Sequence, residues 1–170
     1  MRKIGFWRLT LFALALAVWL MTSRSATAED NVSIKGSFGN SFSVIPTSVP
    51  GVFEVPVIGT GSLSHLGNIT VSVSQLADFT VNPITTSGTL TVTVSDGDQI
   101  FADSTGTVLF LPDGSGFANL DGTLTFTGGT GRFSGASGSA TFSGLTHQDT
   151  PAGGTGLFTL KGHLSSPGLD

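Results

Sequence analysis

Three ionisable side chains beyond the first thirty residues are candidates for chemistry: Glu54, His65 and Arg132. Glu54 is the only Glu and Arg132 the only Arg in this part of the chain. If such groups share one cleft, a carboxylate and an imidazole can exchange protons with a substrate in acid–base catalysis. These three residues are therefore the candidate catalytic residues, and their role depends on the elements that position them.

Each candidate also has a purely structural interpretation. Glu54 alternates with apolar neighbours in Val-Phe-Glu-Val, so it acts as an acid only if its face of the strand lines an interior. His65 can bond the backbone at a strand end. Arg132 lies in a Gly-rich turn, where it can pair with an acid such as Asp121 or bond loop carbonyl groups. The sequence leaves both interpretations open.

The sequence contains no motif for a metal or a cofactor. There is no Cys, and the three His residues do not have zinc-ligand spacing. The segments 96–98 and 113–116 are rich in Asp and Gly, but they lack the spacing of an EF-hand and are typical of hairpin turns. Gly131 is followed by Arg-Phe, whereas a phosphate-binding loop continues with Lys-Ser or Lys-Thr. We therefore predict no metal site and no cofactor.

The first 28 residues have the pattern of a secretory signal peptide. Basic residues precede an apolar run over 9–21, and Ala26-Thr27-Ala28 is a small-residue cleavage site. The apolar run is shorter than the roughly 20 residues that span a membrane, so we expect cleavage after Ala28 and no stable membrane anchor. The prediction is a signal-peptide helix over 1–28, a folded domain over 29–170, and a secreted or periplasmic location.

Cleavage would leave a strongly acidic chain. Residues 29–170 hold three basic and eleven acidic side chains, a net charge of −8. Nucleic-acid binding depends on Lys and Arg that neutralise phosphates, so we predict no nucleic-acid partner. The sequence does not predict the oligomeric state.

Apolar and hydroxyl residues alternate along most of residues 29–170, as in Ile-Thr-Val-Ser-Val-Ser over 69–74. This period of two is typical of antiparallel strands with one face in a core. Turn residues such as Asp-Gly and Gly-Gly separate the runs. The pattern predicts an all-β meander with strands near 32–38, 41–45, 52–63, 68–81, 87–95, 98–111, 115–127, 131–143 and 155–164. We expect it to close into a barrel, because closure removes exposed sheet edges.

Glycine also occurs inside or at the ends of these predicted strands, where it normally weakens pairing. The positions are 59, 61, 88, 106, 116, 138, 144, 156 and 162. We interpret them as sites where strands coil sharply or form bulges, which a small barrel requires.

The segment 121–144, DGTLTFTGGTGRFSGASGSATFSG, contains a strand, a Gly-Gly-Thr-Gly-Arg-Phe turn and a second alternating strand. It resembles the allene oxide cyclase and dirigent barrel superfamily, and most closely its exported bacterial members. The segments GSLSHLG (61–67) and DGDQIFA (96–102) are similar to the same group. The resemblance implies an antiparallel eight-stranded barrel, which agrees with the predicted up-and-down meander. From the turn itself we expect Phe133 to plug one end of the barrel.

The resemblance does not carry an activity with it, because one fold hosts many functions. The leading expectation is an exported barrel without enzymatic activity, which is either structural or binds a small hydrophobic molecule. The first alternative is a cyclase or isomerase that uses Glu54, His65 and Arg132 inside a cavity. A further alternative is a surface adhesion protein with a β-sandwich fold.

Overall fold

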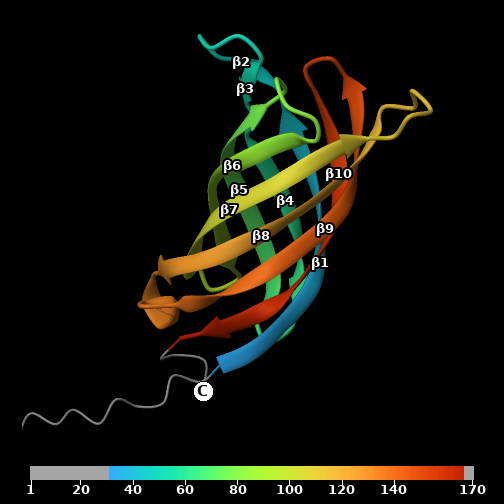
Figure 1. Cartoon of the computed structure of the whole chain (residues 1–170). Helices are drawn as coiled ribbons and strands as arrows, with labels where there is room; N and C mark the ends of the chain where they lie inside the picture. Colours follow the sequence, from blue (N-terminus) through green and yellow to red (C-terminus); the bar gives the residue numbers. More distant parts are fainter. Residues whose placement is uncertain (1–30, 167–170) are drawn as a thin grey trace, which may run out of the picture.

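The protein is described here by a computed structural model that covers residues 31–166. These residues form ten strands and one turn of 3-10 helix (Figure 1). The elements are β1 (Asn31–Ser43), β2 (Ile45–Pro46), β3 (Val52–Glu54), β4 (Val57–Leu63), β5 (Gly67–Asp78), β6 (Ile84–Val94), β7 (Gln99–Phe110), β8 (Phe117–Gly129), η1 (Gly131–Phe133), β9 (Ser137–Thr150) and β10 (Gly153–Ser165).

Eight strands close into an antiparallel barrel in the order β1, β4, β5, β6, β7, β8, β9, β10. The β5–β6 pairing and the β1–β10 pairing leave no open edge among these eight. The first and last strands pair over their whole length, from Asn31 opposite Ser165 to Ser43 opposite Gly153. The predicted all-β, up-and-down barrel is therefore confirmed, and the β-sandwich alternative is wrong because the strands form one continuous closed sheet.

The observed strands differ from the predicted ones at three places. The run 32–38 and residues 41–43 of the run 41–45 form a single strand, β1, whereas Ile45 belongs to β2. The run 52–63 is broken into β3 and β4 at Val55-Pro56, where Pro56 has no N–H for pairing. The run predicted over 131–143 starts only at Ser137, because 131–133 form η1, and it continues to Thr150.

The two ends of the barrel are built differently. At the lower end in Figure 1, η1 lies across the opening, and we call this the closed end. Phe133 is fully buried there and packs with Ile34, Leu124 and Leu164, so the predicted plug is confirmed. At the opposite end, which we call the open end, only Val55, Val57, Ala77 and Ile84 form a small buried cluster.

The glycines inside the strands mainly serve close packing. Of the nine predicted positions only Gly116 and Gly138 have positive φ. At each of the other seven, an added Cβ would come within 3.0 Å of a neighbouring strand or ring. The register shifts of the described strands lie elsewhere, at Phe101/Ala102 and Gly153/Thr155, so no bulge is found at these seven positions, where the missing side chain makes room for atoms of a neighbour.

The predicted signal peptide lies outside the described residues. Within residues 31–166 there is no helix with the length and apolarity needed to cross a membrane.

Candidate functional site

The three predicted catalytic residues do not meet. All are exposed: Glu54 lies on β3 at the open end, His65 lies in the β4–β5 turn, and Arg132 lies in η1 at the closed end. None of them lines a cavity. Their positions give no support to the cyclase or isomerase alternative, which required them inside the barrel.

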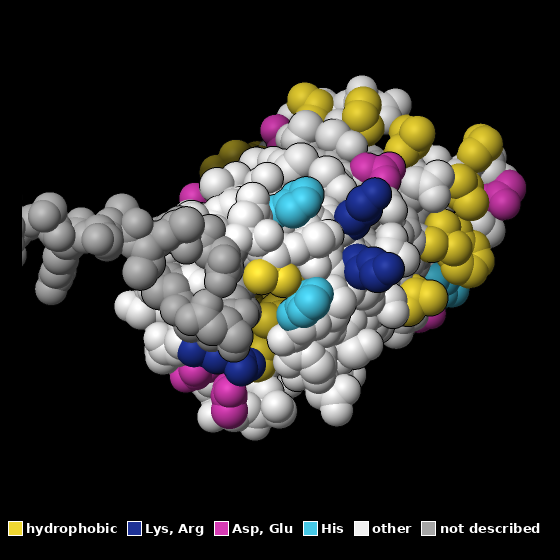
Figure 2. Space-filling model, turned by 90° about the horizontal axis from the view of Figure 1, so that it is seen from below, with side chains coloured by type: hydrophobic (Ala, Val, Ile, Leu, Met, Phe, Trp, Pro, Cys, Tyr) yellow, Lys and Arg dark blue, Asp and Glu magenta, His cyan; other side chains and the backbone are white. Residues whose placement is uncertain are grey.

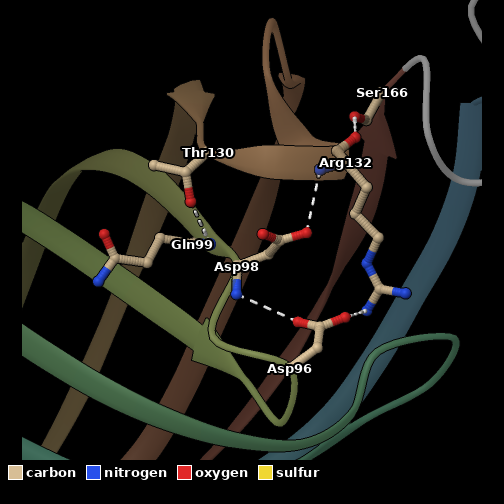
Figure 3. Close-up of polar contacts among 6 residues, drawn as sticks. All are labelled: Asp96, Asp98, Gln99, Thr130, Arg132 and Ser166. Atoms are coloured by element: carbon tan, nitrogen blue, oxygen red, sulfur yellow. Dashed lines mark hydrogen bonds and ion pairs between the residues drawn. The ribbon is translucent and has the colours of Figure 1, made fainter.

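Arg132 fixes the turn that closes the barrel (Figure 3). Its guanidinium lies 3.4 Å from the Asp96 carboxylate, and its backbone N–H donates to Asp98 Oδ2 at 3.0 Å. The Ser166 hydroxyl donates to the Arg132 carbonyl oxygen at 2.7 Å. The expected pairing of Arg132 with an acid is confirmed, and the acid is Asp96 in the β6–β7 turn rather than Asp121, which was named as an example. These bonds hold η1 in place over the core.

A cavity with a mostly apolar lining lies at the open end of the barrel. It has a volume of about 90 Å³ and adjoins a smaller space of about 40 Å³ deeper in the barrel. Both spaces are bordered by Asn40, Val57, Gln75, Leu120 and Phe158. A dry apolar cavity of about 150 Å³ holds a molecule the size of benzene. The two spaces together are smaller than this, so they take a small ring only in part, or the end of a longer apolar molecule that projects through the open mouth.

Phenylalanines that lie opposite glycines of the neighbouring strand shape this space. Phe142 lies opposite Gly122, and Phe158 lies opposite Gly144. Each ring occupies the place that a Cβ of its paired glycine would need. The rings thus lie flat against neighbouring strands, and the space above them stays unfilled.

Two polar atoms in the barrel wall have no hydrogen-bond partner among the described residues. They are Asn40 Oδ1 on β1 and Thr86 Oγ1 on β6, and both residues line the cavity. Thr86 is only 5% exposed. Buried polar atoms are nearly always hydrogen-bonded, because leaving one unpaired costs about 1–3 kcal/mol. Each of the two atoms exposes less than 1 Å², so both are buried in the wall beside the cavity, and it is the unfilled apolar space itself that makes the cavity the candidate binding site.

The remaining polar groups around the cavity are neutral. Gln75, Thr146 and Gln148 border it, and the other lining residues are apolar. No ionisable side chain lines the cavity in the part of the chain that the structure describes. The site therefore suits an uncharged molecule, because a buried charge would have no partner of opposite sign.

Exposed apolar side chains surround the mouth of the cavity. Phe79 and Phe110 line it and are also 41% and 40% exposed. Further exposed apolar residues lie on the segments at this end: Ile45, Val49, Val81, Leu109 and Phe117. Apolar surface is thus continuous from the outside of the rim into the barrel.

Hydrogen bonds lower the pKa of two aspartates in turns at the open end. The Ser115 hydroxyl and N–H donate to Asp113 Oδ1 at 2.6 and 3.0 Å, which holds the pKa of Asp113 below its ordinary value of 3.8. The Thr80 hydroxyl and N–H lower the pKa of Asp78 in the same way, at 2.6 and 2.8 Å. With Glu54 nearby on β3, the rim carries negative charge that repels anions.

His147 forms a second polar arrangement on the outer surface. Its Nδ1 lies 2.6 Å from Asp149 Oδ1, and its ring packs on Phe117 with 4.4 Å between centroids. The Thr155 hydroxyl donates to Asp149 Oδ2 at 3.3 Å, so it bonds the carboxylate and not the imidazole. A nucleophile must contact its base, and this geometry does not provide that contact.

Lys35 and Lys161 lie directly opposite each other on β1 and β10, and both are exposed. Figure 2 shows two basic side chains side by side, next to two histidines. Within residues 31–166, neither lysine forms an ion pair, and no three His, Cys, Asp or Glu side chains gather as metal ligands would. This surface is a local excess of positive charge on an acidic chain.

Sequence reasoning missed Asn40 and Thr86, although the alternation contains a signal for both. Asn40 lies on the same, inward face of its strand as Phe38 and Phe42, two residues away on either side, and Thr86 lies on the same face as Ile84. A polar residue on the apolar side of an alternating strand is the signal that identifies them.

Comparisons with known proteins add no relative. No family model, no curated protein and no solved structure matches the chain. The resemblance to the allene oxide cyclase and dirigent superfamily therefore stays a prediction, and the site is interpreted from its own geometry.

Proposed function

We propose that this protein binds a small, uncharged and largely apolar molecule in the cavity at the open end of its barrel. The observation that carries the proposal is an unfilled space at the open end whose lining is mostly apolar, with a few neutral polar side chains. Specific sites for small molecules combine an apolar lining with a few placed polar groups. The plug of η1 at the other end makes the open end the route of access.

Toluene is a suitable first probe because it is neutral, compact and apolar. We expect saturable binding, detected in NMR spectra as changes in the amide chemical shifts around Ala77, Ile84 and Val108. Ala77 lines the cavity and is 4% exposed, so Ala77→Leu fills part of the space and weakens binding. Ala152→Leu adds the same side chain at an exposed turn and leaves binding unchanged.

Two results would contradict this function. One is the absence of saturable shifts at the cavity in the folded parent protein. The other is equal binding by the Ala77→Leu variant, once its circular dichroism spectrum shows that it is folded. Either would favour a purely structural role for the barrel.

We further propose that the protein acts after export, in the periplasm or outside the cell. The support is the signal-peptide pattern of residues 1–28. Mass spectrometry of the protein isolated from its native host tests this directly. Loss of residues 1–28 is the expected result, and a full-length mass in the cytoplasm would refute it.

A further inference from the structure

We propose that the outer face of the small β2–β3 hairpin is a docking surface for a partner protein segment that is both basic and apolar. The strand register places five side chains on this face, which we call the hairpin face: Ile45, Val52, Glu54, Leu76 and Asp78. None of the five lines the cavity. The hairpin face is therefore a second surface, independent of toluene binding inside the barrel.

The hairpin is an addition to the barrel wall. Eight strands close into a ring without β2 and β3. β3 pairs with residues 76–78 of β5, beyond residues 67–73 that pair with β4, so the hairpin extends the wall at the open end (Figure 1). Since closure of the barrel does not require this element, its outer side chains are free to serve contacts with another molecule.

Apolar and acidic side chains lie side by side on the hairpin face. Ile45 is directly opposite Glu54, and Glu54 is directly opposite Leu76. Side chains in such positions have Cβ atoms about 4.5–5.5 Å apart. Ile45 and Leu76 are 45% and 48% exposed, so two exposed aliphatic side chains flank the Glu54 carboxylate. Asp78 follows on the same face of β5, two residues beyond Leu76.

The barrel holds the hairpin face in place. The Phe79 N–H donates to the Gly51 carbonyl oxygen at 2.8 Å, and the Val55 N–H donates to the Gln75 carbonyl oxygen at 2.8 Å. On the inner side, the Phe53 ring packs edge-on against Phe79 with 5.0 Å between centroids. A surface that is already ordered loses little conformational freedom when a partner binds.

The two carboxylates of the hairpin face have no cation beside them. Within residues 31–166, neither Glu54 nor Asp78 forms an ion pair. The basic residues of this range lie on other elements: Lys35 on β1, Lys161 on β10 and Arg132 in η1. Two carboxylates on neighbouring strands repel each other. A partner that brings Lys or Arg would supply the missing positive charge and relieve this repulsion.

The combination of charge and apolar surface defines the partner. Complementary potentials favour a segment in which Lys or Arg accompanies apolar side chains. A second copy of this chain would place the same carboxylates opposite one another, because a symmetric dimer uses the same patch twice. Anionic lipid head groups would be repelled as well. A basic, apolar protein segment is the occupant that matches both properties.

A short peptide that alternates Leu and Lys is the probe, and fluorescence anisotropy of the labelled peptide measures its binding to the folded protein. We expect saturable binding that weakens as salt is added, with changes in the amide chemical shifts of Ile45, Glu54 and Leu76. A Leu-Glu peptide has the wrong charge and a Ser-Lys peptide lacks the apolar side chains. Neither is expected to show saturable binding.

Two matched pairs of variants test the apolar and the acidic parts separately. Leu76→Ser is expected to weaken binding of the Leu-Lys peptide about threefold to tenfold, because about half of a Leu side chain is newly buried. Leu157→Ser makes the same change at an exposed position on β10 and should leave binding unchanged.

For the acidic part, Glu54→Gln combined with Asp78→Asn is expected to weaken binding about twofold to thirtyfold. The Asn keeps an oxygen that accepts hydrogen bonds from Thr80. Asp103→Asn combined with Asp121→Asn removes two exposed charges elsewhere and controls for the change in net charge.

Several results would overturn the docking surface. They include equal binding of the Leu-Glu peptide, or equal effects of the test and control variants. Self-association in analytical ultracentrifugation that Leu76→Ser abolishes would show that a second copy occupies the face. Binding to vesicles of phosphatidylcholine that Leu76→Ser abolishes, without binding of the Leu-Lys peptide, would assign the face to a lipid surface instead.

Discussion

Replacing Gly144 by Ala tests the packing that shapes the cavity. A Cβ at this position would overlap the Phe158 ring and the Leu157 carbonyl oxygen. The ring cannot move aside easily, because it is 3% exposed and stacks on Phe38 with 5.4 Å between centroids. Overpacking of this kind costs about 1–3 kcal/mol, so we expect Gly144→Ala to lower the free energy of unfolding by about that amount.

Gly39→Ala is the matched control on β1. Gly39 lies in an extended strand, and the nearest atom to an added Cβ is the Gly156 carbonyl oxygen at 3.9 Å. Ala reduces the entropy of the unfolded chain there without a clash, which stabilises a protein by about 0.4–1 kcal/mol. The two substitutions are chemically identical, and their effects on stability are expected to have opposite signs.

Urea unfolding followed by far-UV circular dichroism is the appropriate assay. Residues 31–166 contain no Trp or Tyr, so intrinsic fluorescence does not report on the barrel. With a slope of about 1–3 kcal/mol per molar urea, the expected difference places the two midpoints about 1 M apart. Equal midpoints for Gly144→Ala and Gly39→Ala would refute the packing account.

Three further predictions follow from other parts of the barrel. Thr86→Val removes an unpaired buried hydroxyl and should raise the free energy of unfolding of the ligand-free protein by about 1 kcal/mol. Thr85→Val, at an exposed position on the same strand, should change the free energy of unfolding by no more than about 0.5 kcal/mol. Thermal unfolding of both variants checks this. Lys161→Glu replaces a like-charge pair with Lys35 by an opposite-charge pair and should stabilise the barrel by about 0.2–1 kcal/mol. Urea unfolding at low salt measures this, and the stabilisation should be smaller at high salt. The lowered pKa of Asp113 means that its contribution to stability is present above pH 4 and is lost as the pH falls through the folded-state pKa; an NMR titration midpoint at or above 3.8 would contradict this.

Local patterns predicted most of the strands, because alternation along each strand reports which side faces the core. The turn Gly-Gly-Thr-Gly-Arg-Phe was predicted, but its 3-10 form at 131–133 was not, and a strand was predicted to start at 131. The contacts with Asp96 and Asp98 hold this turn. Those contacts join segments more than thirty residues apart. Local sequence carries no information about them.

The candidate site was harder to predict than the fold. Whether a barrel is hollow depends on how all eight inner faces fill one space, and no single strand determines that. Glu54, His65 and Arg132 attracted attention because they are ionisable, yet all three are exposed. The residues that face the cavity, Asn40 and Thr86, are neutral, and parity along the strand is what singles them out.

The pairing of β1 with β10 has a consequence for how the chain reaches its folded state. These strands are the first and the last of the barrel, so their contacts span more than a hundred residues of intervening chain. Contacts of such long range form late and make folding slow. During synthesis, β1 stays unpaired on one side until β10 has been made, and its exposed edge can pair with other chains in the meantime. Chaperones that bind unfolded polypeptides would protect a chain in this state. Loss of β10 alone would leave the barrel unable to close.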